Sequence, residues 1–172
     1  MPYQPQPGDI GLTRIEGDIG RLIRIGQYLN GDGYADYEHA FVYVGNGQIV
    51  EAEPGGALLS PLTEYDGRPV AWLRCPPGRG PAVADAARGL VGVPYSVLDY
   101  LALAAHRFHI PAPGLRRRIQ SSDHLICSQL ADRAANLGGW HLFQDGRWDG
   151  YVDPAALYRL YLRQAGPART TL

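Results

Sequence analysis

The segment His-Ala-Phe-Val-Tyr-Val-Gly-Asn-Gly-Gln-Ile-Val-Glu-Ala, residues 39–52, decides the fold of this chain. Two runs of β-branched and aromatic residues flank Asn46-Gly47, and an Asn-Gly pair between such runs is the strongest short-range signal for a β-hairpin. We therefore expect one strand over residues 39–44 and a second over residues 48–53.

The segments on either side of this hairpin predict a mixed domain. Asp9 to Thr13 and Pro69 to Arg74 have the composition of strands. Helical periodicity and helix-ending Gly and Pro residues predict helices over residues 18–27, 82–90, 96–108, 126–137 and 154–164. Because strands come early and helices late, we expect an α+β fold in which helices back one side of a small antiparallel sheet.

Composition limits the classes of function. The chain has 172 residues, of which 45% are hydrophobic and 19% charged, so we expect one domain over 1–172, with flexible ends at 1–7 and 166–172. A formal charge of −1 gives no support for a nucleic-acid partner.

The longest apolar stretch falls short of the ~18 residues of a membrane helix. The N-terminal residues lack the pattern of a signal peptide, so we expect a cytoplasmic or phage virion-associated protein. The oligomeric state stays open.

Two cysteines occur in different contexts. Cys127 lies at the start of a predicted helix, where the helix dipole favours the thiolate form of a nucleophile. The alternative is a small buried side chain that fills a gap between helix and sheet. Cys75 lies between Arg74 and Pro76 at a strand end with no helix to activate it, and we interpret it as structural.

A cysteine nucleophile needs a base, and five histidines are candidates: His39, His106, His109, His124 and His141. His39 begins a predicted strand of the hairpin, which is a rigid platform for an imidazole. His106 and His109 end a predicted helix, where a cation suits the dipole without any catalytic role. His124 precedes Cys127 by three positions and is a local neighbour of the thiol or a residue of the helix start.

A third polar group usually orients such an imidazole, and Glu51 and Glu53 on the returning strand are the candidates. The hairpin register decides between a role in the site and a solvated position, because side chains alternate between faces. A two-residue loop pairs Val42 with Glu51 and places both glutamates on the face opposite His39. A three-residue loop beginning at Gly45 pairs Phe41 with Glu51, and it places both glutamates on the same face as His39. We favour the three-residue loop.

Several motifs together resemble one family. They are Gly8-Asp-Ile10, the hairpin at 39–47, Val50-Glu-Ala52, Trp72-Leu-Arg74, Gly92-Val-Pro-Tyr95 and Ile126-Cys-Ser128. In this order the set resembles the circularly permuted papain-like cysteine hydrolases of the NlpC superfamily, specifically the YiiX-like branch. The resemblance covers Gly8 to Leu157. In that family the histidine strand precedes the cysteine helix, and a polar residue follows on the next strand.

The resemblance implies a permuted papain-like fold with a catalytic triad. The nucleophile falls on Cys127, the base on His39 and the orienting residue on Glu51, with Glu53 as the fallback. Because Cys127 lies at a helix start, we also expect its backbone N–H to contact the oxyanion of the reaction, with Tyr95 as a second donor or a substrate contact.

The implied function is that of a cysteine peptidase or amidase, which cleaves amide bonds through a thioacyl-enzyme and needs no cofactor or metal. The implied substrates are cell-wall (peptidoglycan) peptides, other peptide amides and lipid esters. Ile126 and Gln129 depart from the family pattern, which affects substrate preference more than the triad. Two alternatives remain: a non-enzymatic component of a phage tail or surface assembly, and a lipid acyltransferase or esterase.

Overall fold

The structure is a computed structural model that describes residues 3–14, 37–53, 55–94, 126–144, 152 and 154–165. The helices predicted over 18–27 and 96–108 lie outside the described residues, as do Tyr95, His106, His109 and His124.

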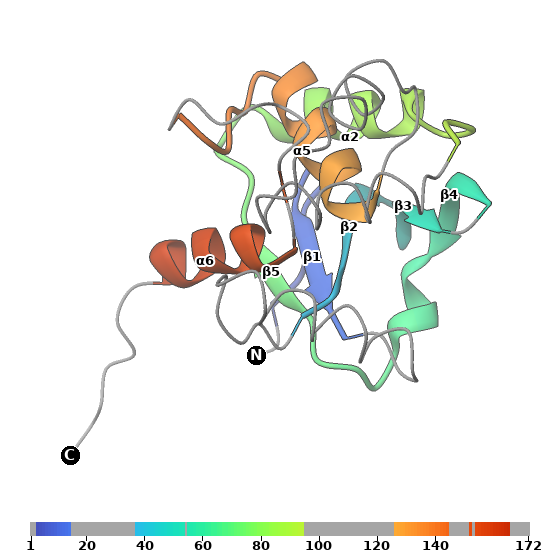
Figure 1. The fold of residues 1–172 in the computed structure, drawn as a ribbon, viewed down its shortest axis with the longest axis horizontal. Helices are drawn as coiled ribbons and strands as arrows, with labels where there is room; N and C mark the ends of the chain where they lie inside the picture. The colour runs from blue at the N-terminus through green and yellow to red at the C-terminus, as the bar shows by residue number, and fades with distance from the viewer. Residues whose placement is uncertain are drawn as a thin grey trace, which may run out of the picture.

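A five-stranded antiparallel sheet forms the centre of the fold (Figure 1). Its strands are β1 (Ile10–Thr13), β2 (His39–Gly45), β3 (Gln48–Glu53), β4 (Gly56–Pro61) and β5 (Ala71–Leu73). They lie in the order β4-β3-β2-β1-β5, and every pair is antiparallel. The four strands predicted from the sequence are confirmed as β1, β2, β3 and β5. Strand β4 and the 3-10 helix η1 (Leu62–Tyr65) that follows it were not predicted.

The described helices are α2 (Gly80–Gly89), α5 (Cys127–Leu137) and α6 (Pro154–Ala165), each within two residues of its predicted bounds. Helix α6 begins at a proline, whose fixed φ suits the first helical position. Helices α2 and α5 pack against each other and against β2, whereas α6 lies beside β5 and β1 (Figure 1). The mixed α+β class with an antiparallel sheet is therefore confirmed.

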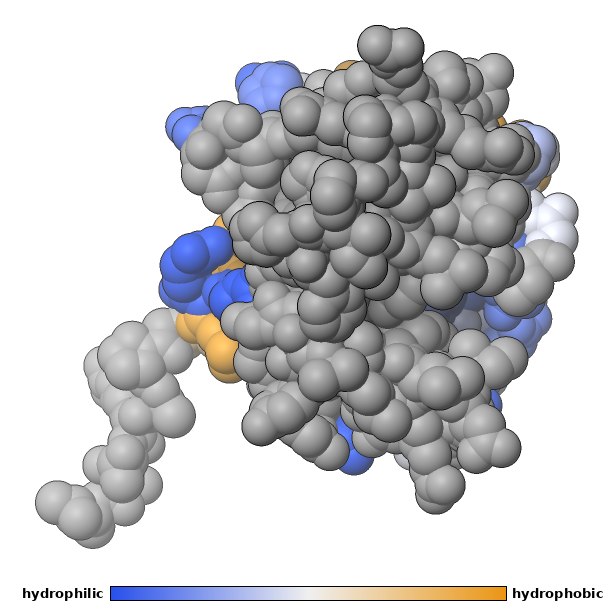
Figure 2. Space-filling view, in the orientation of Figure 1, coloured by the Kyte–Doolittle hydropathy of each residue, from blue (hydrophilic) through white to orange (hydrophobic). Residues whose placement is uncertain are grey.

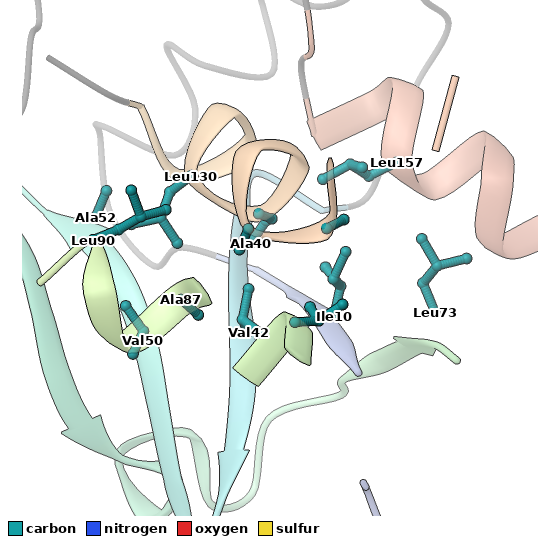
Figure 3. Packing of buried hydrophobic residues seen from close by; sticks show 14 of the residues in the cluster. Ile10, Ala40, Val42, Val50, Ala52, Leu73, Ala87, Leu90, Leu130 and Leu157 are labelled. Carbon is teal, nitrogen blue, oxygen red and sulfur yellow. The ribbon is translucent and has the colours of Figure 1, made fainter. Parts of the chain in front are cut away.

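Alternation along the strands separates two layers of buried side chains. Leu12, Val42 and Val50 belong to the larger core between the sheet and all three helices, as Figure 3 shows for Val42 and Val50. Phe41 and Ile49 point to the opposite face of the sheet, where they form a smaller cluster with Tyr65 of η1. Both faces of the central strands are thus buried, which keeps the hairpin rigid.

The hairpin has the register that we predicted from the sequence, but its loop differs from the predicted one. Phe41 lies opposite Glu51, as predicted. The chain nevertheless turns through two residues, Asn46 and Gly47, which both have positive φ, and the pair Gly45–Gln48 closes this turn. The predicted three-residue loop is therefore wrong. An irregularity of the β-bulge type between Tyr43 and Gly45 takes up one extra residue and restores the register that the loop was expected to set.

Exposed large hydrophobic side chains of the described residues are spread over separate elements. They are Tyr3, Leu59, Val91, Leu137 and Leu162. On the face seen in Figure 2, the described residues show hydrophobic colour only in small separate areas. In the part of the chain that the structure describes, no helix has the length and apolar character needed to cross a bilayer.

Candidate active site

Cys127 begins α5 and is almost completely buried, with 7% of its surface exposed. Its Sγ lies 3.9 Å from the carbonyl oxygen of Glu38. Burial raises the pKa of the thiol, but a hydrogen bond to His39, the positive charge of that imidazole and backbone N–H groups of Ala40 and Ser128 lower it by more. The net pKa of Cys127 is lowered, so the site favours the thiolate.

Side-chain hydrogen bonds fix the start of α5. Ser128 Oγ donates to the carbonyl oxygen of Val152 over 2.7 Å, and Gln129 Oε1 accepts from the backbone N–H of Ile126 over 3.0 Å. Gln129 thus satisfies an N–H group that precedes the helix, as the third residue of a capping box does. Gln129 therefore has a structural role in fixing the helix start that carries Cys127.

His39 connects the thiol to a carboxylate. Its Nε2 lies 2.7 Å from Glu51 Oε2, which leaves Nδ1 as the ring nitrogen for the hydrogen bond to Cys127. Burial lowers the pKa of His39, but the hydrogen bonds to Cys127 and Glu51 and their negative charges raise it to about 10. A raised histidine pKa beside a lowered cysteine pKa favours an imidazolium-thiolate pair at neutral pH.

Glu51 is fully buried, with 0% of its surface exposed. Burial raises the pKa of its carboxyl group, but the hydrogen bonds from His39 and Tyr65 and the nearby Ser60 side chain lower it by more, so the net pKa is lowered. The fallback residue Glu53 lies at the end of β3 and is exposed. The structure therefore brings Glu51, and not Glu53, to the imidazole.

Strands β2 and β3 separate at the place where the start of α5 meets the sheet. In the described residues the pairing of β2 with β3 begins at Phe41–Glu51, although β2 already starts at His39. The thiol of Cys127 lies at this end of β2, which pairs with β1 but not with β3, beside the carbonyl of Glu38 and the N–H of Ala40. The helix start thus reaches the histidine and the glutamate at the point where the two strands separate.

The other described candidates lie apart from this cluster. Cys75 is half-buried, and burial together with the charge of Asp9 raises its pKa to about 11, as expected of an unactivated thiol. His141 is exposed beyond the C-terminal end of α5, opposite the end that carries Cys127, and its Nδ1 lies 3.0 Å from Asn136 Oδ1. Neither residue contacts the cluster of Cys127, His39 and Glu51.

Sequence reasoning missed two residues beside the carboxylate. Tyr65 donates its hydroxyl to Glu51 Oε2 over 2.5 Å, and the side chain of Ser60 lies on the same carboxyl group. Both come from the β4-η1 segment, which had no predicted element. A strand predicted over 56–61 and paired with β3 in this register would have placed Ser60 opposite Ile49, on the face of the sheet that carries Glu51.

Comparison with protein-family models, curated proteins and solved structures found no match for this chain. Among the residues that the structure describes, no group of three or more His, Cys, Asp or Glu side chains is placed to hold a metal ion. The interpretation of the site therefore depends on its geometry.

Proposed function

We propose that this protein is a cysteine hydrolase of the peptidase or amidase type, with Cys127 as the nucleophile, His39 as the general base and acid, and Glu51 as the residue that orients His39. One observation supports this most. The buried thiol of Cys127, at a helix start, is hydrogen-bonded to the His39 imidazole, whose Nε2 lies 2.7 Å from the buried carboxylate of Glu51. Activated nucleophiles in proteins share this chain of nucleophile, base and orienting group.

The proposed reaction has two steps. The Cys127 thiolate attacks the carbonyl carbon of an amide, and the C–N bond breaks as the imidazolium of His39 gives its proton to the leaving amine. Neutral His39 then takes a proton from the water that attacks the thioester, and the carboxylic acid leaves as the Cys127 thiolate and the His39 imidazolium are regenerated. The first turn of an α-helix leaves N–H groups without intrahelical acceptors, so the N–H of Cys127 is suited to the oxyanion.

The order of the elements also supports a permuted papain-like fold of the NlpC type. The histidine strand β2 precedes the cysteine helix α5 in the chain, and the carboxylate lies on the strand after the histidine. Of the substrates that the sequence resemblance implies, we favour peptide amides of the cell wall. Tyr95 stays a prediction as the second oxyanion donor.

Trapping of the acyl-enzyme tests this function directly. We expect p-nitrophenyl esters and peptidyl p-nitroanilides to add one acyl group to the wild-type protein, which intact-mass and peptide mass spectrometry should locate on Cys127. The variant Cys127→Ala should show no adduct, while Cys75→Ser should match the wild type because that thiol has a raised pKa. Absence of any adduct across the panel would instead favour a non-enzymatic module.

The pH profile of hydrolysis should be bell-shaped. The acid limb reports formation of the thiolate, whose pKa is lowered, and the alkaline limb reports loss of the imidazolium proton of His39, whose pKa is about 10. Hydrolysis of an amide needs that proton for the leaving group and should fall near pH 10. Alkylation by iodoacetamide needs only the thiolate and should stay high there. An amide profile that falls between pH 7 and pH 8 would contradict the raised pKa of His39.

A further inference from the structure

We propose that Tyr65 is a positioning residue of this site, which holds the Glu51 carboxylate in line with His39 and keeps it ionised. The inference rests on the proposed function and adds a fourth residue to the triad. It starts from the position of Tyr65 at the end of η1, fourteen positions after Glu51, with its ring against the same face of the sheet.

The first support is that one carboxylate oxygen has two partners. Glu51 Oε2 accepts the hydrogen bond from Tyr65 over 2.5 Å and lies 2.7 Å from His39 Nε2. The carboxylate cannot turn away from the imidazole without also breaking the bond from the phenol. Since Glu51 is fully buried, water cannot replace a lost donor at little cost, which makes the contact restrictive.

The second support is that packing fixes the phenol itself. The Tyr65 ring stacks on Phe41 with centroids 4.9 Å apart and an interplanar angle of 24°. It also stacks on the His39 ring, with centroids 5.9 Å apart and an angle of 25°. The Tyr65 ring therefore packs beside both the His39 imidazole and Phe41, the residue that pairs with Glu51 across the strands.

The third support is electrostatic. Burial, the hydrogen bond to Glu51 and the charges of Glu51, Glu53 and Glu64 all raise the pKa of Tyr65, so the phenol keeps its proton and stays a donor. The guanidinium of Arg68, which lies in the turn after η1, is 5.6 Å from the centroid of the Tyr65 ring. The groups that face the Glu51 carboxyl are His39 from β2, Ser60 from β4 and Tyr65 from η1. Loss of the Tyr65 hydroxyl therefore removes one of the three groups that favour the ionised form of Glu51.

The variant Tyr65→Phe tests the inference, because it keeps the stacked ring and removes only the hydroxyl. The readout is the pH dependence of Cys127 alkylation by iodoacetamide. We expect the acid limb to move to higher pH by about one unit, which corresponds to about tenfold slower labelling on that limb. The reason is that Glu51 gains a proton more easily and then no longer supports the imidazolium that stabilises the thiolate.

Tyr43→Phe is the matched control. Tyr43 packs on the same cluster, but its hydroxyl accepts a hydrogen bond from the N–H of Gly47 at the hairpin turn, away from Glu51. Its acid limb should stay at the wild-type position. In a Glu51→Gln background, Tyr65→Phe should add no further shift if the phenol acts through the carboxylate, whereas a purely packing role predicts the same effect in both backgrounds.

The outcomes separate this inference from the proposed function. If the wild-type acid limb is low and depends on His39 but Tyr65→Phe leaves it in place, the role of Tyr65 is overturned and the triad stands. If the wild-type thiol reacts only above pH 8 whatever residue stands at 39, both proposals are overturned. A shift in Tyr65→Phe that is absent from Tyr43→Phe and from the Glu51→Gln background supports the inference.

Discussion

Replacement of His39 by alanine should slow the alkylation of Cys127 at pH 6 by two to three orders of magnitude. In the wild type the hydrogen bond and charge of His39 outweigh the burial that otherwise raises the pKa of this thiol. Without the imidazole only burial and two backbone N–H groups remain. A thiol with a pKa of about 8.5 is only ~0.3% ionised at pH 6, which sets a loss of about 300-fold. Burial makes the loss larger.

The measurement is the second-order rate of iodoacetamide labelling, followed by mass spectrometry of the Cys127 peptide between pH 4 and pH 10. His141→Ala is the matched control, since this exposed histidine lies beyond the far end of α5 and should leave the rate unchanged. Circular dichroism should show that both variants keep the fold. A His39→Ala variant that labels as fast as the wild type at pH 6 would remove the basis for an imidazole-activated nucleophile.

Replacement of Gly138 by alanine should lower the free energy of unfolding by about 3 kcal/mol. This glycine follows α5, and a Cβ there would lie 2.4 Å from Val83 Cγ2 and 2.6 Å from the Cα and N atoms of Val83 in α2. Its φ of −77° is accessible to every residue, so the cost is steric. Because backbone atoms are involved, α2 and α5 would have to move apart.

Urea denaturation monitored by tryptophan fluorescence measures this difference in unfolding free energy. Gly89→Ala is the matched control in α2, because a Cβ at that position has no heavy atom within 4 Å. Its free energy of unfolding should stay within about 0.5 kcal/mol of the wild type. The additional substitution Val83→Ala should not restore Gly138→Ala, since the backbone contact would remain. A Gly138→Ala variant as stable as Gly89→Ala would contradict the close approach of the two helices.

The elements that could be predicted are those specified by local sequence. Asn46-Gly47 between β-branched runs gives the hairpin, and the glycines after Leu137 end α5. Strand β4 could not be predicted in the same way, because Gly-Ala-Leu-Leu-Ser-Pro contains no β-branched residue. It forms a strand because β3 offers it a pairing edge along its whole length, which is a non-local cause.

The candidate site divides along the same line. Cys127 was found from its place before a helical pattern and His39 from its place on a strand. Glu51 depended on the register, which the sequence indicated for a reason that the structure corrects: a bulge, and not a longer loop, sets it. Tyr65 is one of eleven tyrosines, and no local pattern separates it from the others. Its contact with Glu51 joins residues fourteen positions apart, and it forms only because β4 and η1 fold back beside β3.

The bulge in the hairpin has a consequence for single-residue deletions. His39 and Glu51 stand twelve positions apart, and a shift of one residue in their pairing would move the glutamate to the other side of the sheet. Loss of one residue within the bulge would leave the pairs from Tyr43–Ile49 to Phe41–Glu51 unchanged, whereas loss of one between His39 and Tyr43 would separate acid from base. Among single-residue deletions in the hairpin, one within the bulge should therefore disturb the position of Glu51 relative to His39 least.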